Sequence, residues 1–153
     1  MLDVGCGTGS ALRHASEKVT RGRLIGVDPI PRMVEIARER LVGHPAADRV
    51  ELYVAPAHAL PVGDATVHVV LALDSYDHWG AERLEGLREV RRVLVSGGRF
   101  VVVKDAGVPL AADAKRQWLE DLRATGFTVE SEQHTKTPEV AFTTWVCSVD
   151  AHA

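Results

Sequence analysis

A glycine-rich turn follows directly after the first apolar segment of the chain. Residues 1–9 read Met-Leu-Asp-Val-Gly-Cys-Gly-Thr-Gly, so an acidic residue stands just before glycines at alternate positions. Glycine lacks a Cβ atom and tolerates positive φ, and such a turn lets the backbone pass close to a bound ligand. The dinucleotide fingerprint requires G-x-G-x-x-G, whereas the spacing here is G-x-G-x-G. The turn predicts a ligand site at the end of a first strand and fits a nicotinamide dinucleotide poorly.

Short apolar runs alternate with amphipathic segments along the rest of the chain, without an internal repeat or a low-complexity linker. Strands are expected at residues 2–4, 24–27, 50–54, 67–73, 100–103, 127–132 and 140–149. Helices are expected at residues 10–18, 31–41, 81–95 and 111–124, with Gly97 and Gly98 closing the third. This alternation predicts an α/β fold with a doubly wound, largely parallel sheet and helices on both faces.

The bulk properties favour one ordinary domain. A chain of 153 residues buries roughly 70% of its unfolded surface, and its net charge of −3 creates no global field that favours nucleic acid. No run approaches the ~20 apolar residues of a membrane span, and nothing ahead of the turn reads as a secretory signal. We therefore expect a cytoplasmic protein with neither a membrane nor a nucleic-acid partner. Cys6 and Cys147 predict no metal site, and reduced thiols are expected, with a single disulfide as the alternative.

Three further segments follow the glycine turn. Residues 26–38 read G-V-D-P-I-P-R-M-V-E-I-A-R, residues 57–62 read A-H-A-L-P-V, and residues 89–98 read E-V-R-R-V-L-V-S-G-G. Together with the turn, they resemble in order and spacing the motifs of the class I S-adenosylmethionine (SAM)-dependent methyltransferases, over residues 1 to about 103. The resemblance implies a Rossmann-like sheet with strand order 3-2-1-4-5-7-6 and an antiparallel last strand. It also implies SAM as the cofactor and a small-molecule methyl acceptor.

The cofactor site of such a fold lies where the carboxyl ends of the parallel strands meet. The resemblance implies these cofactor-binding residues: Asp3, Gly5, Cys6, Gly7, Gly9, Asp28, Pro29, Met33, Ala57, His58 and Leu73. Asp28 is expected to hold both ribose hydroxyls, with a helix cap as its alternative role. Asp3 is expected to reach the amino-acid end of SAM, with the loop amides as alternative partners. Met33 is expected to pack against the adenine or ribose, or simply in the core, and His58 to contact the adenine or to lie exposed.

The chain departs from the family pattern at several positions. Pro56 stands where the family usually has an aspartate for the adenine amino group, so that hydrogen bond is not expected. His68 replaces an acid at the amino end of a strand, away from the ligand edge, and a structural role is expected for it. The family also carries one or two helices ahead of its first strand, which cover SAM and help to build the acceptor pocket. We expect residues 1–153 to form a single, N-terminally short domain, either shortened or without a lid, with weak SAM binding and little or no turnover by themselves.

The segment after the fourth expected strand is expected to face the methyl acceptor. His78 falls on a histidine that is frequent in the family at this edge, and the ordinary histidine pKa of about 6.5 suits a general base; capping or packing is its alternative role. Substrate contacts are expected from Asp74, Tyr76, Asp77 and Trp79. The leading hypothesis is methyl transfer from SAM to a small molecule, and the alternative is a SAM-binding or partner module without turnover. A nicotinamide-dependent dehydrogenase is third, and the acceptor and the oligomeric state stay open.

Overall fold

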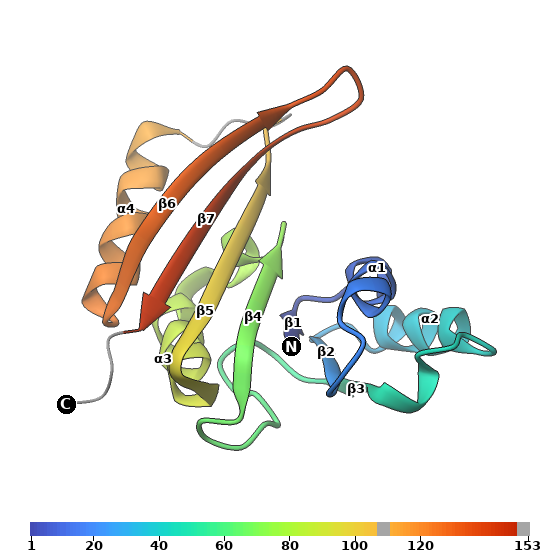
Figure 1. Cartoon of the computed structure of the whole chain (residues 1–153). Helices are drawn as coiled ribbons and strands as arrows, with labels where there is room; N and C mark the ends of the chain where they lie inside the picture. Colours follow the sequence, from blue (N-terminus) through green and yellow to red (C-terminus); the bar gives the residue numbers. More distant parts are fainter. Residues whose placement is uncertain (107–110, 150–153) are drawn as a thin grey trace.

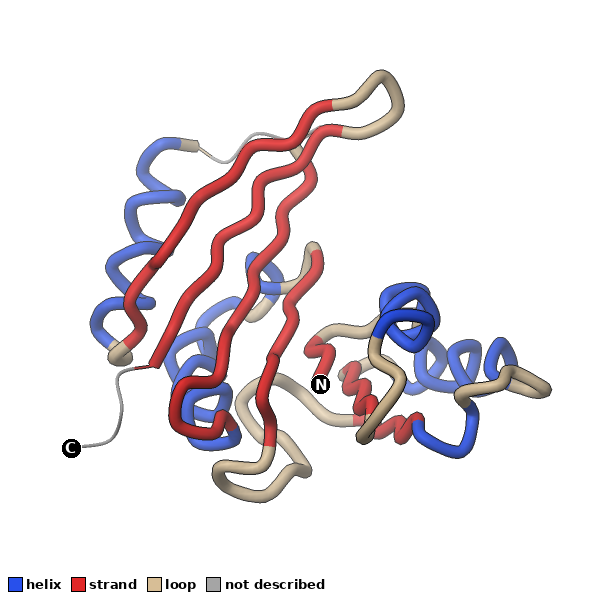
Figure 2. Tube along the Cα trace, viewed as in Figure 1, coloured by secondary structure: helices blue, strands red, loops and turns tan. Residues whose placement is uncertain are grey.

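The computed structural model describes residues 1–106 and 111–149. A seven-stranded sheet crosses the molecule in the order β3-β2-β1-β4-β5-β7-β6 (Figures 1 and 2). Its strands are β1 (Leu2–Val4), β2 (Leu24–Asp28), β3 (Val50–Val54), β4 (Val67–Leu73), β5 (Leu94–Asp105), β6 (Phe127–Lys136) and β7 (Ala141–Val149). The pairs among β1 to β5 are parallel, and β7 is antiparallel to both β5 and β6. The expected strand order and the antiparallel last strand are confirmed.

Helices lie on both faces of the sheet (Figure 1). The helices α1 (Ser10–Lys18) and α2 (Pro31–Leu41) contact β2 and β3, whereas α3 (Arg83–Val93) contacts β5 and α4 (Ala112–Ala124) contacts β6. Pro31 opens α2, where its fixed φ suits the first turn and its missing N–H costs no helical bond. This arrangement is the doubly wound α/β fold that the sequence predicts.

The larger core lies between the sheet and the helices α3 and α4. Val70, Phe100 and Cys147 come from three neighbouring strands, and all are fully buried in it. The ring of Trp118, on α4, lies 5.7 Å from that of Trp145, on β7, measured between centroids. Burial of each large apolar side chain contributes about 1.5–3 kcal/mol, so this face of the sheet is a main source of stability.

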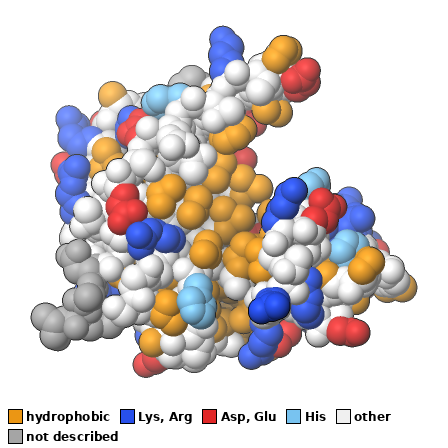
Figure 3. Space-filling view, in the orientation of Figure 1, with side chains coloured by type: hydrophobic (Ala, Val, Ile, Leu, Met, Phe, Trp, Pro, Cys, Tyr) orange, Lys and Arg blue, Asp and Glu red, His pale blue; other side chains and the backbone are white. Residues whose placement is uncertain are grey.

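The opposite face of β4 and β5 carries apolar side chains that no described helix covers. It includes Val69, Leu71, Val101 and Val103, which are half-buried, and Leu73, whose exposed fraction is 40%. Figure 3 shows hydrophobic side chains gathered on this face. Because α1 and α2 contact β2 and β3, this half of the sheet stays open within the described residues.

The third expected helix is shorter than the sequence predicts. It begins at Arg83 and ends at Val93, and Leu94 already pairs with Val67 as the first residue of β5. Val93 and Leu94 are both fully buried, so the chain passes from helix to strand without exposing an apolar side chain. Gly97, at φ 74°, lies within β5 beside a register shift and does not close the helix as expected.

The hairpin of β6 and β7 is longer than the sequence predicts. β6 continues from residue 132 to Lys136, and β7 begins at Ala141. His134, expected in the connecting segment, pairs with Thr143, and its Nδ1 lies 2.8 Å from Thr143 Oγ1. Residues 132–140 are exposed. Their sequence lacks the apolar alternation by which a half-buried strand is recognised, so this end of the hairpin was not predicted.

The two cysteines lie apart in the structure. Cys6 and Cys147 are free, buried thiols in different clusters of the core.

No helix among the described residues is long and apolar enough to cross a membrane. Within residues 1–106 and 111–149, no group of three or more His, Cys, Asp or Glu side chains could hold a metal ion.

Candidate functional site

The glycine turn joins β1 to α1 at the carboxyl edge of the sheet, and its backbone is tied to both neighbouring strands. The N–H groups of Gly5 and Cys6 donate to the carbonyl oxygen of Val27 at 2.8 and 2.9 Å. From the other side, Ser75 Oγ donates to the carbonyl oxygen of Val4 at 2.5 Å. Gly5 has φ 78°, and a Cβ atom there would lie 2.4 Å from the Cβ of Ser75. Position 5 therefore requires glycine both for its backbone conformation and for the close approach of Ser75.

The other residues of the turn divide into two kinds. Gly7 has φ 51° and no atom within 4 Å of the place where a Cβ would lie, so its backbone is uncrowded. A Cβ at Gly9 would lie 3.2 Å from Ala37 Cβ, so the absence of a side chain at Gly9 lets the start of α1 approach α2 closely. Cys6 packs in the core with Leu12, and burial, with the nearby carboxylates, raises the pKa of its thiol to about 12. Gly7 is thus accessible, whereas Gly9 and Cys6 support the packing beneath the turn.

Asp28 ends β2 and fixes the geometry of this edge. Its Oδ2 accepts a hydrogen bond from the N–H of Gly7, and its Oδ1 accepts one from the N–H of Ile30, both at 2.9 Å. The side chain is buried, with an exposed fraction of 7% for the residue. No side chain caps the first turn of α2, so the capping role considered for Asp28 is not seen. Each carboxylate oxygen has a second acceptor position, which leaves Asp28 able to hold two hydroxyl groups.

Asp3 is a buried acid with an unsatisfied oxygen. The residue is 1% exposed, and its Oδ1 has no hydrogen-bond partner. Burial, and secondarily the negative charge of Asp28, raise the pKa of Asp3 to about 7. A buried acceptor without a partner is costly, and a cationic or donating group placed beside it would relieve both the missing bond and the charge repulsion.

A cavity of about 460 Å³ lies at the ends of β1, β2, β3 and β4. The sequence-predicted residues that line it are Gly5, Asp28, Pro29, Ala57, His58, Asp74, His78 and Trp79. The further lining residues are Val4, Ile30, Ala55, Pro56, Ser75 and Glu82. Six of the expected cofactor residues are not among them: Asp3, Cys6, Gly7, Gly9, Met33 and Leu73. Met33 is half-buried on α2, and Leu73 lies on the open face of β4.

Glu82 is the cavity residue that sequence reasoning missed most clearly, and Ser75, although it lies in the segment expected to face the acceptor, was given no role. Glu82 falls inside the region expected as a helix and ends instead the short 3-10 helix η3 (Gly80–Glu82), so helical periodicity gave no signal for it. Ser75 directly follows Asp74, a predicted substrate residue, and its place after the β4 strand was the available signal. Ile30 is 52% exposed, and its position two residues after Asp28 could have pointed to it.

The end of β4 forms an acidic corner stabilised by a lysine. Asp74 has φ 48°, and its Oδ1 accepts a hydrogen bond from the N–H of Asp105 at 2.7 Å. Asp77 pairs with Lys104 at 2.9 Å between Oδ2 and Nζ, and that hydrogen bond, more than the nearby charges, raises the pKa of Lys104. Lys104 lies on β5, thirty residues from Asp74, and no motif indicated it. His78 is exposed in this corner and lines the cavity.

Tyr76 lies in the core, whereas Trp79 lines the cavity. Tyr76, in the short helix η2 (Tyr76–His78), is 1% exposed, and its ring lies 4.6 Å from that of Trp118. The structure thus places Tyr76 in the aromatic core and not along the cavity where it was expected to orient an acceptor. Trp79 contacts Tyr76 with ring centroids 5.1 Å apart and lines the cavity, in the position expected of an apolar wall.

The remaining expected residues lie where the sequence placed them or beyond the cavity. His68 is exposed at the amino end of β4, away from this edge, as expected. Asp77 does not line the cavity, because its carboxylate is turned toward Lys104. The cavity has two halves. One half lies at the ends of β1 and β2, where hydrogen bonds fix the backbone, and the other half is formed by the segment after β4.

Comparison with known proteins agrees with this geometry. Residues 2–102 match the model of a family described as a methyltransferase domain, which covers more than half of the chain. The chain belongs to this family. These SAM-dependent methyltransferases use S-adenosylmethionine as their cofactor, and members are enzymes. An acid at the end of β2, a glycine turn after β1 and the 3-2-1-4-5-7-6 sheet are the features of this chain that correspond to the family resemblance.

Two curated relatives and one solved structure illustrate the similarity. A ubiquinone/menaquinone biosynthesis C-methyltransferase of Geotalea uraniireducens (strain Rf4) is 33% identical over 105 residues, 68% of this chain and 44% of that protein. The 27-O-demethylrifamycin SV methyltransferase of Amycolatopsis mediterranei (strain S699) is 36% identical over 121 residues, 76% of this chain and 43% of that protein. A SAM-dependent methyltransferase from Aquifex aeolicus shares the fold with a TM-score of 0.79 at 20% identity, over 97% of this chain and 81% of that one. The chain spans less than half the length of the two curated relatives.

Proposed function

We propose that this chain binds SAM in the 460 Å³ cavity and transfers its methyl group to a small molecule. The observation that carries the proposal is the pair of buried acids at this edge of the sheet, of which Asp28 lines the cavity and Asp3 lies near enough to feel its charge. Asp28 is already oriented by two backbone amides, and Asp3 has an oxygen without a partner. A ligand with a pair of vicinal hydroxyls and a positively charged end satisfies both acids at once.

The proposed cofactor contacts follow from this placement. Asp28 holds the ribose hydroxyls, Asp3 faces the amino group, and the backbone of residues 5–7 approaches the amino-acid end. Ala57 and His58 line the adenine side of the cavity, where Pro56 offers no hydrogen-bonding side chain. SAM, when bound, supplies a methyl group already activated by the positive sulfonium. Met33 and Leu73 remain predicted contacts and, like Asp3, Cys6, Gly7 and Gly9, do not line the cavity.

The acceptor side of the proposal rests on the segment after β4. His78 is exposed at the cavity and can remove a proton when the acceptor is a hydroxyl or an amine. Trp79 gives an apolar wall, and Asp74 a polar group for the same ligand. The two relatives, named for ubiquinone/menaquinone biosynthesis and for a rifamycin, support an acceptor with a largely apolar ring system and a hydroxyl group. Alignment of that acceptor with the methyl group is the main catalytic task of the protein.

The alternative function is SAM binding without turnover, as a partner module. Pro56 is the observation that favours it, because the cavity lacks a side-chain acceptor at that position. For both functions we propose a single domain over residues 1–153, located in the cytoplasm, with no nucleic-acid or membrane partner.

Titration calorimetry tests the cofactor assignment. We expect S-adenosylhomocysteine to bind and NAD to give no measurable heat of binding. The reverse result would overturn the assignment. Incubation with SAM and a panel of naphthols and hydroxynaphthoquinones then separates the two functions, because only a methyltransferase produces S-adenosylhomocysteine in an acceptor-dependent way.

A further inference from the structure

Gly86 is a glycine inside a helix, at a position where the backbone does not require one. It is the fourth residue of α3, it is buried, and its φ does not lie in the positive region. Glycine within a helix is less favourable than alanine, because it loses more conformational freedom on folding. The reason for glycine at this position must therefore lie in what surrounds it.

Two residues that line the candidate cavity converge on Gly86. A Cβ atom there would lie 2.8 Å from Cε3 and 3.2 Å from Cζ3 of Trp79, and 3.3 Å from the Cβ of Ala57. Trp79 lies on the acceptor side of the proposed site and Ala57 on the adenine side. A side chain at position 86 would therefore displace a residue of the cavity wall.

The loop that carries Ala57 is anchored on the same helix. The N–H of Leu60 donates to Glu89 Oε2 at 2.8 Å, and the carbonyl oxygen of Leu60 accepts from Arg92 Nη2 at 3.1 Å. Glu89 and Arg92 also pair with each other at 2.6 Å. Both follow Gly86 at intervals of three residues, so they share its side of α3. The anchored loop has little freedom to move away from Gly86, and Trp79 is the neighbour that must yield.

The ring of Trp79 can yield in one direction. On its core side lie Tyr76 and Phe100, both fully buried, with ring centroids 5.1 and 6.2 Å from that of Trp79. Trp79 itself is half-buried and lines the cavity. A close-packed core accepts extra volume poorly, so a ring displaced by a Cβ at position 86 moves into the cavity.

We propose that Gly86 is a positioning residue of the candidate site: because it has no side chain, the ring of Trp79 stays against α3 and leaves the cavity open to its ligand. Gly86 is not among the residues that line the cavity, so it acts through Trp79. The inference rests on the proposed function for the identity of the ligand, but the placement of the ring does not depend on it.

Gly86→Ala tests this role, because it adds the Cβ atom while favouring the helix. We expect calorimetry to show a loss of S-adenosylhomocysteine affinity of about tenfold. Without ligand, a soluble gadolinium chelate should relax the indole N–H signal of Trp79 more strongly, since the displaced ring is more exposed. The indole signals of Trp118 and Trp145, which are buried in the core, should stay unchanged.

Trp79→Phe supplies the rescue. Phenylalanine lacks the Cε3 and Cζ3 atoms of the indole, which are the atoms nearest to the added Cβ. In the Trp79→Phe chain, Gly86→Ala should therefore lower the affinity by less than about threefold, and the difference between the two backgrounds measures the coupling of the two positions. Equal loss in both backgrounds would show that Gly86 acts by another route, which overturns the proposal.

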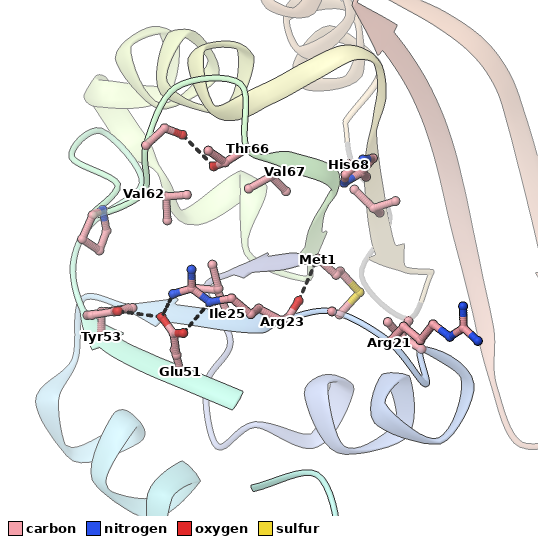
Figure 4. Close-up of a pocket in the computed structure, with 15 residues that line it drawn as sticks. Met1, Arg21, Arg23, Ile25, Glu51, Tyr53, Val62, Thr66, Val67 and His68 are labelled. Carbon is pink, nitrogen blue, oxygen red and sulfur yellow. Dashed lines mark hydrogen bonds and ion pairs between the residues drawn. The ribbon is translucent and has the colours of Figure 1, made fainter. Parts of the chain in front are cut away.

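Gly63→Ala is the matched control. Gly63 lines a second cavity, of about 820 Å³, at the opposite edge of the sheet, where Figure 4 shows Val62 and Thr66. A Cβ at Gly63 would lie 3.6 Å from Thr66 Cγ2, which is an ordinary contact. We expect neither the S-adenosylhomocysteine affinity nor the relaxation of Trp79 to change in this variant.

The remaining outcomes separate this proposal from the proposed function. Unchanged affinity or unchanged relaxation of Trp79 in Gly86→Ala would contradict the positioning role. Loss of the fold would contradict it too, because the proposal requires the ring to yield into the cavity. If the chain without substitutions binds no S-adenosylhomocysteine, the proposed function fails, whereas the relaxation of Trp79 still decides the role of Gly86.

Discussion

The two halves of the candidate site are held in different ways. At the ends of β1 and β2, backbone amides and the carboxylate of Asp28 bond to one another within a buried frame, and Gly5 is fixed by contact with Ser75. At the end of β4, His78 is exposed, and Asp77 forms an ion pair with Lys104 of β5. The first half presents a rigid surface suited to one invariant ligand. The second presents side chains that can change with the acceptor while the fold stays the same.

The largest expected effect lies in the exposed half. Under the proposed function, His78→Asn removes the general base, and turnover should fall by about 10²–10⁴-fold if the acceptor must lose a proton. Affinity for S-adenosylhomocysteine should stay unchanged, because the well-bonded half is intact. The matched control is His58→Asn, the other histidine of the cavity, which is expected to alter cofactor affinity more than the rate. Equal loss of rate in both variants would remove the catalytic role of His78.

The next effect lies in the rigid half. Under the proposed function, Asp28→Ala removes the charge-assisted hydrogen bonds proposed to the ribose, worth on the order of 1.5–3 kcal/mol, so calorimetry should show at least a tenfold loss of S-adenosylhomocysteine affinity. The variant also frees the N–H groups of Gly7 and Ile30, and a modest drop in melting temperature is expected without ligand. Asp28→Asn keeps one acceptor oxygen, so its S-adenosylhomocysteine affinity and its melting temperature should lie between those of the unchanged chain and those of Asp28→Ala. A large drop in melting temperature without a loss of S-adenosylhomocysteine affinity would contradict the binding role of Asp28 and leave it a structural role in the loop.

The third expected effect is a pH dependence that belongs to Asp3, which is gradual because it is spread over several pH units. The ordinary pKa of an aspartate is about 3.8, and burial raises the pKa of Asp3 to about 7, so between these two pH values the folded chain holds more protons than the unfolded chain. The free energy of unfolding should therefore fall as pH rises from about 4 to about 7 and level off above that. A bound cation favours the carboxylate, so SAM affinity should fall by up to about tenfold per unit as pH drops below 7.

Asp3→Asn provides the control for this pH dependence. Asparagine keeps the shape and does not titrate in this range, so both slopes should flatten in the variant. Denaturant titrations from pH 4 to pH 8 measure the first slope, and calorimetry over the same range measures the second. Unchanged slopes would place the titrating group elsewhere.

The sequence predicted the fold better than the second half of the site. The strand order was expected from the family resemblance alone. The positions of Asp3 and Asp28 were expected from local motifs, because the glycine turn and the end of β2 are short segments that can be recognised in the sequence. The β6–β7 hairpin was underestimated since its exposed end has no apolar period. Tyr76 was misplaced because a tyrosine beside polar residues looks accessible, while its burial depends on Trp118, forty-two positions away. Lys104 was missed for the same reason: its partner Asp77 is reached only through the pairing of β4 with β5.

The close approach of Gly5 and Ser75 restricts which residues can occupy these two distant positions together. A side chain on either one uses the space of the other, since a Cβ at position 5 would lie 2.4 Å from that of Ser75. In an alignment of relatives with the present turn, position 5 should therefore be glycine and position 75 should exclude bulky residues. A library randomised at both positions and selected for folding should return glycine at position 5 together with a small residue at position 75. Alanine at position 75 should survive only with a looser turn, because it loses the hydrogen bond to Val4.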